Sequence, residues 1–556
     1  MTQRSAEEIS QFLEAQDHYF GGENSEGDED FVEDDSDDNE DVFKYHKNNL
    51  YQDIESHYGV LVDSDNVTND NVEKQANIYP EYIYRHKWYL APPETRERQW
   101  DIMLHSVSVI SPGAKNQAIH AKLPLEVWSL LFSDELLEIV LKYTNQEIER
   151  YRKTENCANA TFIDNLNMTE LKAFIGLLYF NGMEKKIDIT IEELWSADFE
   201  SALYRTTMSR QRFEFIAARL RFADKFTRVI GRRDLLEPVR DIWNIFIKNC
   251  RENYTPSEFL TLDDQFLKFE GKFGAKVYMK NNPERCGIKI TSLNDAKTFY
   301  MYNAIPYPGR TEEMLFTSRN RETFPNYCVR TLCESISHTT RNVTCNNSYI
   351  NSVEVFSETL RNYQLTMVGI LEKRKTHIPE SFDCWTSAGA VRCAYDDTNV
   401  LLSYCSEKHI YSKKVSLFLS SYHKNGATKN KESDKPEIID FYNKTKDSTN
   451  IFEQLCTSYT CARKTNRWSL RFFLGMLDQA AVNSCILYNF NPEHKMRNQR
   501  IFLKDLAISL IVPYLRERFE QHDIHKAIKW SIIQILMKVK AKQDKENSEN
   551  KFDKIK

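Results

Sequence analysis

An aspartate inside an apolar segment is the first residue of this sequence that could do chemistry. Asp263 lies in FLTLDDQFLKFEGK (259–272), whose apolar and aromatic residues predict a strand. An acid inside an apolar strand is unusual. A two-metal phosphodiester site needs about three carboxylates from separate elements, converging on a pair of Mg²⁺ ions. Spacing alone favours the simpler interpretation, in which Asp263 and Asp264 end an edge strand.

A second segment presents amides where another acid could stand. In RNVTCNNSYINS (341–352), residues 342–345 are typical of a short buried strand. Asn346 and Asn347 follow it, and side chains that end a strand are presented at a sheet edge. The chemistry of this edge therefore depends on why these residues are amides and not acids.

Helical patterns lie on both sides of these strands in the sequence. Apolar residues recur at helical spacing in 124–150, 168–183, 208–224, 467–490 and 507–521. Alternation predicts further strands at 276–280, 287–295, 297–309 and 365–371. Residues 376–440 are interpreted as irregular. This order predicts a mixed α/β fold, with a sheet embedded between helical segments.

The composition indicates a folded body with an acidic arm. The chain has 556 residues, 41% of them hydrophobic, which predicts at least one large core. Residues 23–41 contain twelve Asp or Glu and no Lys or Arg, so removing them from the formal net charge of -7 leaves +5. We expect a solvated, disordered arm over residues 1–95. Competition with DNA, or docking on a basic partner, is the alternative.

Several classes of protein are excluded by missing patterns. Residues 1–10 have no apolar core of signal-peptide length, and no apolar run approaches about 18 residues, so neither secretion nor a membrane span is expected. The 12 cysteines include no C-x-x-C pair, so neither a disulfide framework nor a zinc site is predicted.

Six segments resemble the piggyBac family of DNA transposases in order and spacing. The resemblance covers roughly residues 121–515, and it implies an RNase H-like core with an insertion, embedded between two halves of a helical dimerisation and DNA-binding domain. The segments are TLDDQFLKFEGK, YMKNNPERCGIKI, DAKTFYMYNAIPYPGR, RNVTCNN, LTMVGILEKRKTHIP, and FYNKTK through CTSYTCARKTNRW.

The resemblance implies a division of the chain into domains. The helical domain would have its first half at 96–258 and its second half at 456–540. The RNase H-like core would occupy 259–375 and 441–455, with the insertion at 376–440. The charged tail, 541–556, contains no cysteine, so the cysteine-rich zinc module common in this family is missing and recognition of transposon ends is not expected.

The family's catalytic motif falls on a degraded set of residues. The motif consists of three aspartates with a fourth acid one helical turn after the third. The resemblance assigns the first position to Asp263, the second to Asn346, the third to Asn450 and the fourth to Glu453. Asp447 is a conceivable substitute for the third, but the segments on either side leave no gap that would move it there.

Two amides in place of acids should prevent metal binding. An amide oxygen can ligate Mg²⁺ but brings no charge, and a unit charge at about 4 Å contributes roughly 4 kcal/mol at an effective dielectric near 20. That corresponds to about three decades of affinity. We therefore expect no metal cofactor and no cleavage or joining of DNA. Mg²⁺ is expected only if the alternative below holds.

The resemblance also implies DNA contacts. In VGILEKRKTHIP the family's first basic residue is replaced by Glu372, while Lys375 remains. A basic cluster beside an aromatic residue suits phosphate contact and stacking, although core packing explains the tryptophan equally well. Upstream, Arg210, Arg212, Arg219 and Arg221 could extend this surface or line a solvated helix face. The implied contacts downstream are Arg463, Lys464, Arg467 and Trp468.

These observations predict a nuclear, transposase-derived pseudoenzyme. It would retain DNA binding and dimerise, either with itself or with an active relative, and it would have no membrane association. One alternative is a transposase with residual Mg²⁺-dependent activity that uses Asp263, Asp447 and Glu453. Another is a decayed copy of a transposable element without a selected role.

Overall fold

The structure, a computed structural model, describes most of the chain. The acidic run at 23–41 and Lys375 lie outside the described residues. The described ranges are 3–17, 86–93, 111–155, 161–197, 201–224, 234–278, 286–310, 313, 317, 323–346, 352–373, 377–405, 414–426 and 435–553.

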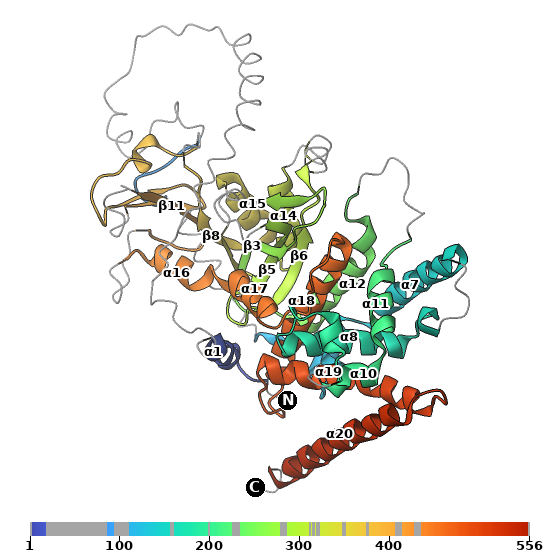
Figure 1. The fold of residues 1–556 in the computed structure, drawn as a ribbon. Helices are drawn as coiled ribbons and strands as arrows, with labels where there is room; N and C mark the ends of the chain where they lie inside the picture. The colour runs from blue at the N-terminus through green and yellow to red at the C-terminus, as the bar shows by residue number, and fades with distance from the viewer. Residues whose placement is uncertain are drawn as a thin grey trace, which may run out of the picture.

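A nine-stranded mixed sheet lies at the centre of the molecule (Figure 1). Its order is β4-β5-β3-β7-β8-β11-β10-β9, and β6 also pairs with β5. Strands β3, β5 and β6 form an antiparallel meander, while β7 and β8 run parallel to β3. The bounds are β3 Phe259–Lys268, β4 Lys276–Tyr278, β5 Cys286–Asp295, β6 Met301–Pro306, β7 Asn342–Cys345, β8 Thr366–Ile370, β9 Val391–Tyr395, β10 Val400–Cys405 and β11 Val415–Ser420.

The interpretation of residues 376–440 as irregular is wrong. Strands β9, β10 and β11 lie in this segment, and β11 pairs antiparallel with β8, so the segment extends the same sheet. The strands are short and carry serine and cysteine, which weakened the alternation in the sequence. Pairing with β8 provides the burial that the pattern alone did not reveal.

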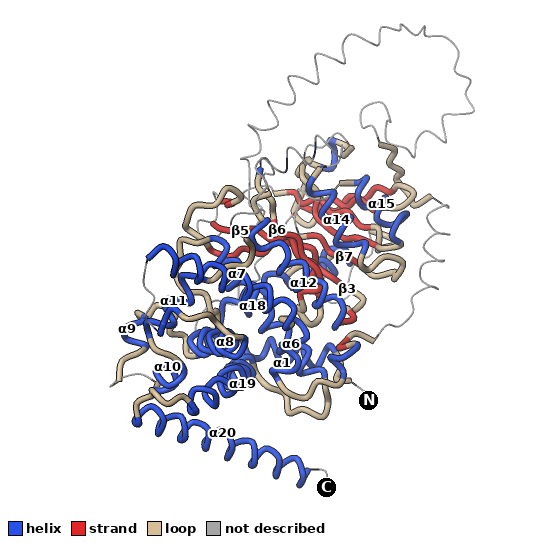
Figure 2. The backbone as a smooth tube through the Cα atoms, turned by 90° about the vertical axis from the view of Figure 1, so that its right-hand side faces the viewer, coloured by secondary structure: helices blue, strands red, loops and turns tan. Residues whose placement is uncertain are grey.

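Helices from both ends of the sequence pack into one body beside the sheet (Figure 2). The helical pattern predicted over 124–150 is confirmed as two helices, α6 and α7, the second of which begins at Asp134. None of the described helices combines the length and apolar composition needed to cross a bilayer. The helices are α6 Pro124–Leu131, α7 Asp134–Glu155, α8 Met168–Met183, α9 Ile191–Leu194, α10 Ala202–Thr207, α11 Arg210–Arg219, α12 Glu237–Asn253, α18 Trp468–Phe490, α19 Gln499–Glu520 and α20 Lys526–Asp553.

Helix α18 connects this helical body to the sheet. Every residue from Phe472 to Phe490 is buried. A Cβ added at Gly475 would lie 2.6 Å from a methyl carbon of Leu267, so the glycine permits the close approach of α18 to β3. Gln479 donates from Nε2 to Oε1 of Gln265 across the same interface, at 2.8 Å. The strand that carries Asp263 is thus held by the helical body.

Two pairs of helices cover the two faces of the sheet. Helices α14 (Phe324–Glu334) and α15 (Val353–Tyr363) contact β5, β6 and β8, while α16 (Glu437–Thr445) and α17 (Ser448–Ser458) contact β3 and its neighbours. Successive strand residues face opposite sides. Odd-numbered residues of β3 therefore face α16 and α17.

The prediction of a disordered arm over residues 1–95 is wrong for two described stretches. Residues 6–17 form helix α1 (Ala6–Asp17), which buries Ile9 against the core. Further along, Trp88 is fully buried and donates from Nε1 to the carbonyl of His377 at 2.7 Å, and Tyr89 pairs with Tyr395 at the edge of β9. One or two apolar anchors hold each stretch, too few to produce a periodic pattern.

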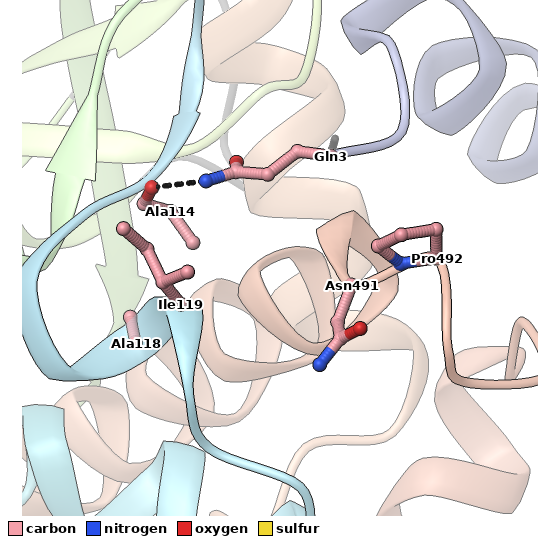
Figure 3. Close-up of a pocket in the computed structure, with 6 residues that line it drawn as sticks. All are labelled: Gln3, Ala114, Ala118, Ile119, Asn491 and Pro492. Atoms are coloured by element: carbon pink, nitrogen blue, oxygen red, sulfur yellow. Dashed lines mark hydrogen bonds between the residues drawn. The ribbon is translucent and has the colours of Figure 1, made fainter. Parts of the chain in front are cut away.

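A small pocket marks where the N-terminal residues dock (Figure 3). Gln3 donates from Nε2 to the carbonyl of Ala114 at 2.6 Å, and Asn491 and Pro492 lie across from it. The space admits about one water molecule, so it is not a ligand site.

Candidate functional site

Parallel pairing of β3 and β7 brings Asp263 and Asn346 together. The last paired residues of the two strands are Leu262 and Cys345. Asp263 and Asn346 directly follow them, so both lie where the pairing of β3 with β7 ends. The backbone N–H of Asn346 donates to the carbonyl of Leu262 at 3.1 Å, which continues the ladder by one step. The Asn346 side chain then donates from Nδ2 to Oδ2 of Asp263 at 2.8 Å. The residues predicted for the first and second motif positions are therefore in direct contact.

Helix α16 fixes the orientation of the Asn346 amide. The hydroxyl of Tyr442 donates to Oδ1 of Asn346. Helix α16 is itself held across both strands, because Thr445 accepts from Thr261 through its carbonyl and its hydroxyl lies 2.6 Å from that of Thr344. The amide nitrogen consequently faces the carboxylate, and the amide oxygen faces a buried phenol.

The other oxygen of Asp263 also accepts a hydrogen bond. Oδ1 of Asp263 accepts from the backbone N–H of Asp264 at 2.8 Å. The side chain of Asp264 lies on the opposite face of the sheet. Its Oδ2 is 2.8 Å from Nζ of Lys289, and its Oδ1 accepts from the hydroxyl of Thr291 at 2.7 Å. This ion pair compensates a buried charge. Only the first aspartate of the pair belongs to the candidate site.

Helix α17 carries Asn450 and Glu453, the residues predicted for the third and fourth motif positions. Oε2 of Glu453 accepts from the backbone N–H of Phe266 at 3.0 Å. That N–H lies on β3 beyond the end of β7, so the carboxylate takes the place of a missing strand partner. Asn450 lies one turn earlier and is half-buried, and Asp447 is the N-cap residue of α17.

The arrangement does not fit a pair of magnesium ions. Mg²⁺ takes an octahedral set of oxygen ligands, in which one or two protein carboxylates are joined by waters and substrate phosphates. Here both oxygens of Asp263 accept hydrogen bonds, one of them from an N–H₂ group, and the oxygen of Asn346 accepts from Tyr442. Among the described residues, no group of three or more His, Cys, Asp or Glu is placed to hold a metal ion.

Arg463 and Arg467, two of the side chains predicted to contact DNA, donate to the protein's own backbone carbonyls. Arg467 donates from Nη1 to the carbonyls of Ala217 and Ala218, both at 2.9 Å, at the end of α11. A cation there satisfies carbonyls that the helix leaves without partners. Burial lowers the pKa of Arg467 to about 10. Arg463 donates to the carbonyls of Lys186 and Ile189.

The other predicted contacts differ in exposure. Trp468 stacks on Phe273, with ring centroids 4.4 Å apart and an interplanar angle of 23°, whereas Lys464 is exposed. Glu372 is also exposed, and Lys375 lies outside the described residues. The upstream arginines contact the helical body: Arg212 pairs with Glu170, Arg221 with Glu147 and Arg210 with Glu192, while Arg219 lies over the ring of Tyr151.

Sequence reasoning missed two buried polar residues, of which one contacts Asn346. Tyr442 was within the FYNKTK segment, but nothing in its spacing indicated a contact with Asn346, 96 residues away. Asp478 is buried in α18, where Thr460 and the backbone N–H of Cys461 donate to it at 2.6 and 2.8 Å. Burial raises the pKa of Asp478 to about 6. A carboxylate inside a largely apolar helix was the available signal.

Comparisons with known proteins agree with this fold. A family model described as Transposase IS4 matches residues 123–485, which is more than half of the chain. Human PiggyBac transposable element-derived protein 3 is 24% identical over 171 residues, covering 30% of this chain and 26% of the human protein. The match therefore spans about a quarter of that relative's length.

A solved structure matches over much more of the chain. It is the cryo-EM structure of the piggyBac transposase synaptic complex with hairpin DNA, and the matched chain is 32% identical with a TM-score of 0.71. The match covers 77% of this chain and 88% of that one. The chain belongs to the transposase IS4 family, and within it to the piggyBac transposases.

Proposed function

We propose that this protein is a transposase derivative that lacks two-metal catalysis but retains DNA binding and dimerisation. Its partner is a second copy or a related active transposase, and it acts in the nucleus. The observation that carries the proposal is the Asn346 amide, which donates to Asp263 and accepts from Tyr442. The second motif position thereby contributes an N–H₂ group to the site where catalysis needs a negative oxygen.

The proposed loss of metal binding has an electrostatic cause as well as a geometric one. For its oxygen to face a cation, the Asn346 amide would turn away from Tyr442, leaving a buried phenol without its acceptor at a cost of about 1–3 kcal/mol. Asn450 removes a second negative charge, and Glu453 is engaged by the backbone of β3. These changes add to each other, because each lowers the attraction for the same pair of ions.

The strand order supports an RNase H-like core within the proposal. The three antiparallel strands β3, β5 and β6 are followed in the chain by β7 and β8, which run parallel to β3, and the spatial order is β6-β5-β3-β7-β8, with the short β4 also paired to β5. In this interpretation residues 259–375 and 441–455 are the core and 376–440 the insertion. Residues 96–258 and 456–540 are then the two halves of the helical domain.

DNA binding is proposed from the family and from the surface charge. The related structure holds hairpin DNA in a synaptic complex, and we extend that property to this chain as affinity for the phosphate backbone. Since Arg463 and Arg467 donate to backbone carbonyls, the exposed Lys464 is the member of that cluster best placed for phosphate contact. Such binding depends on salt and reads little sequence.

The test is a paired binding and cleavage experiment on the full chain. End-labelled hairpin and linear duplex DNA are incubated with the protein in Mg²⁺ or Mn²⁺, beside Asp263→Ala as the matched control. We expect complexes that weaken as salt rises, and equal, background-level cleavage by the two proteins. Cleavage by the parent that Asp263→Ala abolishes would overturn the proposal. It would favour residual activity through Asp263, Asp447 and Glu453.

A further inference from the structure

Helix α20 extends along one end of the helical body (Figures 1 and 2). It packs against α10 and α19. On the side that faces them, Ile532 is fully buried, and Ile528, Ile535 and Leu536 pack against the core. This side accounts for the attachment of the helix to the body.

The opposite side of α20 carries a second apolar stripe. Trp530 is 62% exposed and Met537 is 66% exposed. Seven residues span about two helical turns, so the two side chains lie on one side, roughly half a turn from Ile532. A helix that is apolar on two opposite sides is normally covered on both, and a large exposed tryptophan beside an exposed methionine is typical of a binding surface.

The charges around this stripe select its partner. Residues 526–542 include five lysines and no acid: Lys526, Lys529, Lys538, Lys540 and Lys542. A second α20 laid on the same stripe would bring its own five lysines, so self-pairing there is opposed by repulsion. An acidic segment with apolar side chains satisfies both the charge and the stripe.

We propose that residues 28–43 of the same chain dock along the Trp530–Met537 stripe. This segment, DEDFVEDDSDDNEDVF, contains ten acidic residues and no basic one, and it offers two apolar pairs, Phe31–Val32 and Val42–Phe43. The segment lies outside the described residues, whereas α1 ends at Asp17, eleven residues before it. Helices α1 and α20 lie at the same end of the molecule in both views.

Covalent continuity favours this partner over a separate acidic peptide. Eleven extended residues reach about 36 Å, and a short tether gives an effective concentration in the millimolar range. Weak contacts are then sufficient, because the apolar pairs can cover Trp530 and Met537 while Lys526, Lys529, Lys538 and Lys540 meet carboxylates on both sides of the stripe. Lys542 already pairs with Asp505.

Zero-length carbodiimide cross-linking of the full chain tests the proposal. A carbodiimide joins a carboxylate to a lysine amine that touches it, with loss of water. Unlabelled and ¹⁵N-labelled chains are mixed in equal amounts, cross-linked and digested, and the joined peptides are identified by mass spectrometry. We expect links between acids of residues 28–41 and lysines of 526–540, with both peptides carrying the same isotope.

A variant that preserves every charge separates docking from charge attraction alone. Trp530→Ala with Met537→Ala should lower the yield of these links about tenfold, since it removes the apolar contacts. Tyr278→Ala, at a side chain that is 63% exposed on β4, is the matched control and should change nothing. Circular dichroism checks that the helix persists.

Three results would overturn the proposal. Links whose yield is unchanged in the double variant Trp530→Ala with Met537→Ala would show charge attraction without docking on the apolar stripe. Links that join a ¹⁵N-labelled peptide to an unlabelled one would show that a second copy supplies the acids. An absence of links, with lower DNA affinity in the double variant, would assign the stripe to nucleic acid instead. None of these results bears on whether Asp263 supports cleavage.

Discussion

Replacing Asn346 with aspartate would bring two carboxylates into direct contact. The present amide nitrogen lies 2.8 Å from Oδ2 of Asp263, and Asp263 is only 8% exposed, so water screens the new pair poorly. With charge centres about 4 Å apart and an effective dielectric near 20, the repulsion is roughly 4 kcal/mol. The lost hydrogen bond adds about 1 kcal/mol. Sharing a proton can relieve part of this, so we expect Asn346→Asp to lose about 3–5 kcal/mol of unfolding free energy in EDTA.

A divalent cation should reverse that loss in the variant and have no effect on the parent. The same pair of carboxylates that repel each other in EDTA would attract Mg²⁺, and a ligand at 100 times its Kd stabilises the folded state by about 2.7 kcal/mol. Urea unfolding at pH 7.5, in EDTA and in Mg²⁺, measures both effects. Asn346→Asp combined with Asp263→Asn is the matched control, because it exchanges the two groups and restores a single charge.

Two outcomes would refute this reasoning. If Asn346→Asp in EDTA is as stable as the parent, the two side chains are not coupled as their contact indicates. If Mg²⁺ stabilises the parent itself, and Asp263→Ala removes that effect, the amide does not prevent metal binding and the proposed loss of catalysis is wrong.

The remaining predictions concern the support of the site and its surroundings. Tyr442→Phe removes the donor to Asn346 and should cost about 1–2 kcal/mol in urea unfolding; a larger loss in the Asn346→Ala background would contradict coupling between them. Because burial raises the pKa of Asp478 from 3.8 to about 6, the folded protein binds that proton more tightly than the unfolded chain, so stability should rise by about 3 kcal/mol as pH falls from above 6 to below 4. Asp478→Asn should remove this part of the pH profile, and an unchanged profile would refute it. Arg467→Ala should cost about 1–3 kcal/mol of stability by exposing the end of α11. Lys464→Ala should leave stability within about 0.5 kcal/mol and reduce the salt slope of DNA binding by about 1; equal effects of these two variants on stability would contradict their different environments.

Periodicity predicted the elements that bury one continuous apolar pattern. The strands around Asp263 and before Asn346, and helices α8 and α18, were predicted close to their observed bounds, whereas α19 begins eight residues before the predicted 507 and α12 and α20 were not predicted. It failed for β9, β10 and β11, which are short and mixed in composition, and for α1, which is anchored chiefly by Ile9. Their stability comes from partners distant in the sequence, which a local pattern cannot report.

For the candidate site, the sequence indicated the types of the residues but not their hydrogen-bond partners. The sequence indicated that Asn346 stands where an acid is expected, since strand endings and the family motif are local features. It could not indicate that Tyr442 fixes this amide or that Glu453 binds the backbone of β3. It favoured phosphate as the partner of Arg467, whereas the structure shows this side chain bound to a helix end some 250 residues earlier.

The sequence by itself determined the family, most of the alternation of helices and strands, and the absence of charge at Asn346 and Asn450. These follow from the identity and spacing of neighbouring residues. Only the tertiary structure decided that Asn346 donates to Asp263, that Arg463 and Arg467 bind carbonyls, and that α20 exposes a second apolar side. A hydrogen bond or a buried surface belongs to pairs of groups that the fold brings together, so it has no signature in either segment alone.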